Sequence, residues 1–487
     1  MGESQEQSVP WGYRWRSSGR FILIATATSV LTDMYRHQFV VSILPSILED
    51  RLDLEPEILQ RVSVALLAQT ALISFLVTPL IGRLANCLGA RTWLQLGLLG
   101  QLLGSLVVAS SHSVIGLFGG RAVQALANTI VGVQGVKTLS SVGSSNRHEK
   151  TQRYLSLAVA AGSSGGPLVA GTLFEISDYW VAWKTASAAS SLGIILQSLM
   201  LVPSEDLPRE PEVSDVPRYP EEGPDERSSL LSSSFESTKT IKTHLPADVE
   251  SVKRDLNLYL HLLTSRRYMG GIMISVCFTI VSVSFDTTMP LHVGEAFGWG
   301  SQLTGILFAV LHGPHVFLSV PTHWLKNRVG SHHTASVGFL GLGVLLWLAG
   351  TPGSEQGSWA ASGDRPAVIY ASAVAAAGVF MSLLQGAGLT ETACKSHPRC
   401  DKSRGAVQEL ETQQTRAFDQ EAVAHAMVIS SLSVKLGLFL GPIISGRLVE
   451  NGGYYEMSCV LGEFESSRGC QHPDLQTALK RFWMWLD

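Results

Sequence analysis

Long apolar runs separated by short polar loops dominate the pattern along this chain. Eleven of them are nearly free of charge and about match the ~20 residues that a helix needs to cross a ~30 Å hydrocarbon core. They cover 21–45, 62–81, 92–110, 114–136, 154–176, 180–202, 268–291, 301–323, 334–351, 366–389 and 423–448. The pattern predicts an all-α integral membrane protein in which six helices, a gap and five more helices follow one another.

Residues 204–266 separate the two groups of helices and differ from both in composition. They are rich in Pro, Glu and Ser and poor in aromatic residues, so they lack the apolar surface that a folded core needs. We expect a disordered cytoplasmic linker between an amino-terminal six-helix half at 21–203 and a carboxyl-terminal half at 267–450. A cytoplasmic tail at 1–20 precedes the first half, and an atypical tail at 451–487 follows the second.

The charged residues support a membrane protein and predict its orientation. Only 16% of the residues are charged, against roughly 25% in soluble domains. Arg14, Arg16 and Arg20 precede the first span, whereas the loops at 177–179 and 292–300 carry no lysine or arginine. Since basic residues near span ends favour the cytoplasmic side, we expect the amino terminus and the linker to be cytoplasmic.

Nothing in the sequence indicates catalysis. The six cysteines are scattered over different spans and loops without the spacing of a metal site. We find no phosphate-binding loop and no nucleophile motif. The prediction is a protein that is not an enzyme, uses no cofactor or metal and binds no nucleic acid.

A ten-residue motif occurs twice, once in the fifth span of each half. "GSSGGPLVAG" at 162–171 and "GLFLGPIISG" at 437–446 both read Gly-x-x-x-Gly-Pro-x-x-x-Gly. Small residues let membrane helices approach closely, and neighbouring helices satisfy the carbonyl that a proline leaves unpaired. Such a repeat is typical of secondary transporters whose halves rock about a central site. Ordinary small-residue packing explains it as well.

Three further motifs accompany this repeat in the first half. Asp33 lies twelve residues before Pro45 in the first span. "GRLANCLGAR" at 82–91 follows the second span, and "RAVQALAN" at 121–128 lies in the fourth. The residues that carry the motifs are Asp33, Gly82, Asn86, Gly89, Arg91, Arg121, Gln124, Gly162, Gly166, Pro167 and Gly171, with Gly441 and Pro442 in the second half.

Together these motifs resemble those of the major facilitator superfamily, specifically its twelve-span drug:proton antiporters and, among them, fungal members similar to vesicular amine transporters. The resemblance covers about 20–203 and 267–450, and it implies a bundle of two pseudo-symmetric six-helix halves. Asn86 and Ala125 depart from the family's usual acidic residue and glycine. The implied function is proton-coupled export of small organic molecules such as drugs or secondary metabolites. The glycines of the fifth span are expected to meet a helix of the other half and seal one side of the cavity.

Four polar residues inside the spans are candidates for proton coupling or substrate binding: Asp33, Arg121, Gln124 and Asp286. A charge at mid-membrane costs roughly 2.5–3.5 kcal/mol, so each one needs a reason. Asp33 can exchange a proton or attract a cationic substrate. It can equally form a local ion pair, because Arg36 and His37 follow three and four residues later on the same helical face.

The roles of the other candidates stay open. Asp286 either pairs with Asp33 or Arg121 across the cavity or caps its span in solvent. His312 and His315 either carry protons or form hydrogen bonds in the core. Lys435 contacts substrate, pairs with a charge inside the protein, or extends its ammonium group toward the membrane surface.

The expected twelfth helix is truncated, because the chain after "GGYYEMSCVLG" is too charged to cross a membrane. A transport-inactive sensor or scaffold, or a truncated transporter without function, is therefore the alternative to an antiporter. The expected partners are protons, a small organic substrate and the lipid bilayer, with the chain acting as a monomer. The plasma membrane is the expected location, and a vacuolar or vesicular membrane is the alternative.

Overall fold

The computed structural model describes residues 12–84, 88–142, 148–200, 266–352, 365–385 and 412–469, all within one compact unit. These residues form helices and no strand. Residues 204–265 of the expected linker, Asn86 and residues 470–487 of the expected tail lie outside the described residues. A short helix, α1 (Tyr13–Arg16), precedes the long ones.

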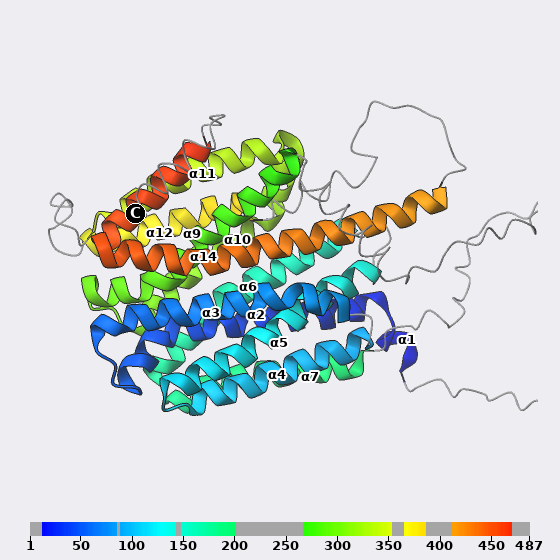
Figure 1. Cartoon of the computed structure of the whole chain (residues 1–487), viewed down its shortest axis with the longest axis horizontal. Coiled ribbons are helices and arrows are strands. Elements are labelled where there is room, and N and C mark those ends of the chain that lie inside the picture. Colours follow the sequence, from blue (N-terminus) through cyan, green and yellow to red (C-terminus); the bar gives the residue numbers. More distant parts are fainter. Residues whose placement is uncertain are drawn as a thin grey trace, which may run out of the picture. The chain divides into compact units, whose positions relative to one another are not determined.

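Helices occupy all eleven predicted spans (Figure 1). The amino-terminal group consists of α2 (Gly19–Asp50), α3 (Pro56–Leu84), α4 (Ala90–Ser110), α5 (Val114–Val142), α6 (His148–Ile176) and α7 (Tyr179–Leu199). The carboxyl-terminal group consists of α9 (Arg266–Phe297), α10 (Ser301–Val329), α11 (Ser331–Gly350), α12 (Arg365–Leu384) and α14 (Thr412–Gly469). The prediction of an all-helical fold is confirmed.

Nine helices in the described part of the chain are long and apolar enough to cross a membrane by length and composition alone. Of the eleven long helices only α2 and α7 are not among them. Four polar residues within six positions lower the hydropathy of α2 at its centre: Asp33, Arg36, His37 and Gln38. These polar side chains mark the helix as part of the interior of the bundle, since lipid would not solvate them.

Apolar side chains fill the interior of each group and also cover its outside. Phe39, Leu66 and Leu117 are buried in the core of the amino-terminal group, and Phe308 and Leu342 in that of the other group. Many large apolar side chains are nevertheless exposed, including Leu76, Leu103, Ile195, Phe317 and Val344. A soluble protein would not present so many, so these side chains form the surface that contacts lipid.

The last helix, α14, contains a break that the sequence pattern does not reveal. Gly453 has a φ of 78° and divides it into segments 412–452 and 454–469, and Figure 1 shows the second segment turning back beside α11. Tyr454, Met457 and Leu461 of that segment are buried in the carboxyl-terminal core. The residues from 470 onward lie outside the described part of the chain, so the truncation of the twelfth helix stays a prediction.

Several buried hydroxyl groups form hydrogen bonds within their own helices. The side chains of several serines and threonines donate to the carbonyl oxygen four residues earlier at 2.6–2.8 Å, as in Thr70, Thr78, Thr129, Ser284 and Thr287. These bonds need no partner from a neighbouring helix. These hydroxyls can therefore lie in membrane helices without an unsatisfied donor, and they do not determine which helices pack together.

Candidate functional site: a polar cavity in the amino-terminal group

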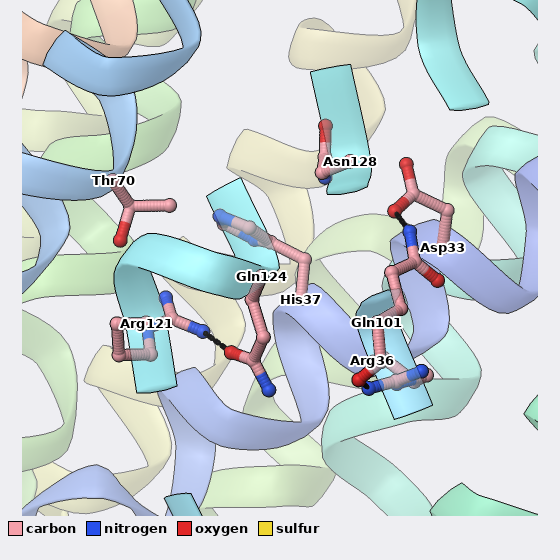
Figure 2. A pocket seen from close by; sticks show the side chains of 8 residues that line it. All are labelled: Asp33, Arg36, His37, Thr70, Gln101, Arg121, Gln124 and Asn128. Atoms are coloured by element: carbon pink, nitrogen blue, oxygen red, sulfur yellow. Dashed lines mark hydrogen bonds between the residues drawn. The ribbon is translucent and has the colours of Figure 1, made fainter. Parts of the chain in front are cut away.

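A small cavity lies among α2, α3, α4 and α5. Its volume is about 20 Å³, and a site needs roughly 10–15 Å³ to hold one water molecule. The cavity is therefore too small for an organic substrate in this conformation, and the helices must separate to admit one. The lining residues are Asp33, Arg36, His37, Thr70, Gln101, Arg121, Gln124 and Asn128 (Figure 2).

Asp33 lies at one side of this cavity with only 3% of its surface exposed. The Nε2 group of Gln101, on α4, donates a hydrogen bond to one of its carboxylate oxygens. Arg36 on the same helix and Lys435 on α14 both attract the carboxylate electrostatically. The structure therefore places Asp33 in the interior as predicted, with one cation from each group of helices near it.

Arg36 connects three helices of the amino-terminal group. One terminal nitrogen, Nη1, donates to the hydroxyl of Ser190 on α7 at 2.7 Å. The other, Nη2, donates to the backbone carbonyl of Gln101 and to the hydroxyl of Ser105, both on α4. Within the described part of the chain, Arg36 therefore attracts Asp33 electrostatically without forming a hydrogen bond or ion pair with it, and its hydrogen bonds go to neutral groups on other helices.

Arg121 and Gln124, one turn apart on α5, lie on the opposite side of the cavity from Asp33 (Figure 2). Arg121 donates from Nη1 to Oε1 of Gln124 at 3.0 Å, and Gln124 donates from Nε2 to the hydroxyl of Ser105 at 2.8 Å. Arg121 is 2% exposed, and its Nε and Nη2 atoms have no hydrogen-bond partner. The structure brings three of the four predicted site residues to one cavity.

Asp286, the fourth candidate, is placed differently from the prediction. It is buried on α9, so it does not cap the span in solvent. Nε2 of Gln38 donates to its Oδ2 at 3.2 Å, and Nε2 of His312 lies 3.7 Å from its Oδ1. The predicted pairing with Asp33 or Arg121 is not formed. The α2 residue Gln38 reaches Asp286 because it lies on a different side of the helix from Asp33.

The glycine motif of α6 does not meet the other group of helices along its whole length, and that part of the prediction is wrong. A Cβ atom added at Gly162 would lie 2.9 Å from the backbone nitrogen of Tyr35, and one at Gly166 would lie 3.1 Å from that of Phe39. Both neighbours belong to α2 of the same group. The first two glycines therefore bring the fifth helix against the first, which carries Asp33.

The third glycine of the motif does contact the other group. A Cβ atom at Gly171 would lie 2.9 Å from the carbonyl carbon of Ser301 and 3.3 Å from the Cα atom of Gly305, both on α10. The second motif makes equivalent contacts, since Gly437 and Gly441 pack on α9. Pro167 and Pro442 lie inside their helices. The pseudo-symmetry of the two halves stays a prediction that these matching contacts support.

Polar contacts also join the two groups near Gly171. The hydroxyls of Ser46 on α2 and Ser301 on α10 are 2.8 Å apart, and the backbone nitrogen of Gln302 donates to Glu175 at 2.7 Å. These residues lie near the helix ends that the charge pattern predicts to be external. The groups are thus in tight contact on that side of the membrane.

The motif after the second span has few described contacts. A Cβ atom at Gly82 or Gly89 would have no neighbour within 4 Å. Arg91 donates from Nη2 to the backbone carbonyl of Ser198 on α7. A conformational role for this motif therefore stays a prediction.

Sequence reasoning missed Gln101, Ser105 and Ser190, which hold the charged residues in place. Gln101 could have been selected from the sequence, because its polar amide group lies within the apolar run 92–110. The two serines gave no signal, because serine is common in membrane helices. Two residues whose roles the sequence left open have acidic neighbours. Lys435 is attracted electrostatically by Asp33, and the ring of His312 lies beside the carboxylate of Asp286.

Comparison with known proteins identifies similar sequences over most of the chain. A family model described as Major Facilitator Superfamily matches residues 22–396. An uncharacterized MFS-type transporter of Schizosaccharomyces pombe is 23% identical over 89% of this chain and 90% of its own length. A protein named MFS-type transporter ppzB from Metarhizium rileyi is 22% identical over 93% of both chains. Its namesake in Metarhizium majus is 20% identical over 88% of this chain.

Proposed function

Because the chain belongs to the Major Facilitator Superfamily, we propose that it is a proton-coupled antiporter that exports small organic molecules such as drugs or secondary metabolites. As a member of this family it is a multi-pass integral membrane transporter and not an enzyme. The proposal concerns the coupling, the direction and the substrate.

The observation that carries the proposal is the position of Asp33. Its carboxylate is buried in the middle of α2 and lines the cavity, where a fixed negative charge is costly. A protein gains from such a group when the group takes up a proton in one conformation and releases it in another. Gln101 holds one carboxylate oxygen, which keeps the group at the cavity wall.

Lys435 provides a way for the proton to act on the conformation. It lies on α14, in the carboxyl-terminal group, and attracts Asp33 on α2 across the two groups. Protonation of Asp33 removes this attraction, so the two groups of helices separate more easily where α2 and α14 face each other. The proton then biases an equilibrium between two arrangements of the helices, which is what coupling requires.

The energy available from protons suffices for export. One proton moving inward contributes about 2.3 kcal/mol per 100 mV of membrane potential. Since about 1.4 kcal/mol corresponds to a factor of ten, one proton drives a substrate gradient of roughly fifty-fold at 100 mV. We place the protein in the plasma membrane as a monomer, with a vacuolar or vesicular membrane as the second choice.

The test is proton movement in proteoliposomes that contain the purified chain. A small library of amphiphilic organic molecules is added to wild-type protein, Asp33→Asn and the matched control Asp178→Asn. Asp178 is an exposed carboxylate at the start of α7. We expect substrate-dependent proton flux in the wild type and the control, and its loss in Asp33→Asn. Flux that survives in Asp33→Asn contradicts the assigned role. Folded wild-type protein that moves neither protons nor substrate supports the sensor or scaffold alternative.

A further inference from the structure

Arg121 is a buried cation that has no counter-ion among the described residues. It is 2% exposed, and in the described part of the chain no carboxylate lies within ion-pair distance of its guanidinium group. Arg36, a second cation of the same cavity, repels it. A buried charge normally persists only with a partner, so the absence of one at a cavity wall suggests that the partner arrives from outside the protein.

The free atoms of Arg121 define the shape of that partner. Nη1 is used by Gln124, whereas Nε and Nη2 have no hydrogen-bond partner. These two nitrogens form one edge of the planar guanidinium group, and their N–H bonds point in parallel. A carboxylate is the group that accepts both bonds at once.

The charges around the cavity favour an anion as well. Asp33 is the acidic lining residue, and Arg36 and Arg121 are both basic. Lys435 adds a positive charge from α14 that acts on Asp33 and His37. Asp286 also acts on the lining residue His37, and it accepts a hydrogen bond from Gln38. With it, two acidic residues stand against Arg36, Arg121 and Lys435. A cationic substrate would therefore meet a surplus of positive charge.

We propose that the cavity binds organic monocarboxylates, whose carboxylate group takes the free Nε–Nη2 edge of Arg121. This inference rests on the proposed function, since it takes the cavity to be the transport site. The 20 Å³ cavity cannot hold such a molecule, so binding requires the more open arrangement that transport also requires. Gln124 positions the guanidinium group through Nη1 and leaves the other edge free.

Ligand binding to the full-length purified protein tests this proposal independently of proton flux. The probes are three carboxylates: phenylacetate, 4-phenylbutyrate and decanoate. Each is compared with the amide and the amine of the same carbon skeleton. Binding is followed as the ligand-dependent rise in the thermal unfolding midpoint, with acetate and inorganic phosphate as controls for a simple anion effect. We expect at least one organic carboxylate to bind ten-fold or more tightly than its amide and amine.

Two variants locate the site. Arg121→Gln removes the charge, whereas Arg121→Lys keeps the charge but lacks the two parallel N–H donors at Nε and Nη2. We expect both variants to weaken carboxylate binding at least ten-fold. Arg365→Gln, at an exposed arginine that begins α12, is the matched control and should bind as the wild type does. If Arg121→Gln fails to fold, Arg121→Lys decides the question.

Several outcomes overturn the proposal. They are equal binding of amines or amides, equal effects of acetate or phosphate, no carboxylate binding at all, and undiminished binding in Arg121→Lys.

The Asp33→Asn variant separates this proposal from the previous one, because it should keep or strengthen carboxylate binding while losing proton coupling. Carboxylate binding with proton flux intact in Asp33→Asn refutes the coupling role alone. Loss of flux in Asp33→Asn without any carboxylate binding refutes the present proposal alone.

Discussion

Replacing Gly171 by alanine should loosen the contact between α6 and α10 on the predicted external side. The added Cβ atom would lie 2.9 Å from the carbonyl carbon of Ser301, and closer still to its oxygen. Carbon atoms in good contact are about 3.5–4.0 Å apart, so the helices must move apart by at least about 0.6 Å. Because the atoms it meets belong to the backbone, no side chain can turn aside to make room.

The size of the effect follows from the cost of overpacking. Forcing an extra methyl group into a close contact costs about 1–3 kcal/mol. If the external side separates during transport, that strain is relieved in the separated arrangement. The ratio of separated to joined molecules then rises by roughly 5- to 150-fold. We expect Gly171→Ala to favour conformations that are open to the outside.

The assay is the rate at which a membrane-impermeant maleimide labels Ser46→Cys in a background with the six native cysteines replaced. Ser46 is half-buried at the same junction, 2.8 Å from the hydroxyl of Ser301. Gly165→Ala is the matched control, because its Cβ atom would have no neighbour within 4 Å. Both variants gain the same helix propensity of about 1 kcal/mol, so the difference between them reports the contact. An unchanged labelling rate in Gly171→Ala, or equal acceleration in both variants, would refute the reasoning.

Three other predictions concern stability and are checked by unfolding in detergent. Tyr370→Phe breaks the buried 2.9 Å hydrogen bond to Tyr454 and should cost about 1–3 kcal/mol, while adding Tyr454→Phe should cost little more; additive losses would contradict this. The pair Arg61–Glu450 is 2.8 Å long, but the arginine side chain is 73% exposed, so a double-mutant cycle should give about 0–1 kcal/mol. Met457→Ala should cost about 2–5 kcal/mol, and a change near zero would show that the segment after Gly453 is not packed.

The helices could be predicted from the sequence because lipid imposes a simple rule on them. An apolar run long enough to cross the membrane must be helical, and a helix lies in the described part of each of the eleven runs. Their ends were harder to predict, since a helix continues past the hydrocarbon. The run at 62–81, for example, belongs to a helix from Pro56 to Leu84.

The site was predicted in part, for reasons that particular residues make clear. Asp33, Arg121 and Gln124 could be selected because charge and amide groups are conspicuous in apolar runs. The neighbours of Gly162 and Gly166 could not, because a small residue shows that something approaches closely and not which helix it is. The partner of Asp286 could not be predicted either, because it depends on which side of α2 faces α9. Turning α2 about its axis by the angle between two successive residues would bring a different side chain than Gln38 to Asp286.

The buried hydroxyls have a consequence for how easily such a protein changes shape. Several of these groups donate to a carbonyl of their own helix, as Thr70 does to Leu66 and Thr287 to Val283. When one helix slides or turns against another, the hydroxyl travels with its acceptor and no hydrogen bond is broken. Such hydroxyls therefore do not resist the sliding of one helix against another, whereas hydrogen bonds that cross between the two groups, such as Ser46 to Ser301, stabilise one arrangement of the helices.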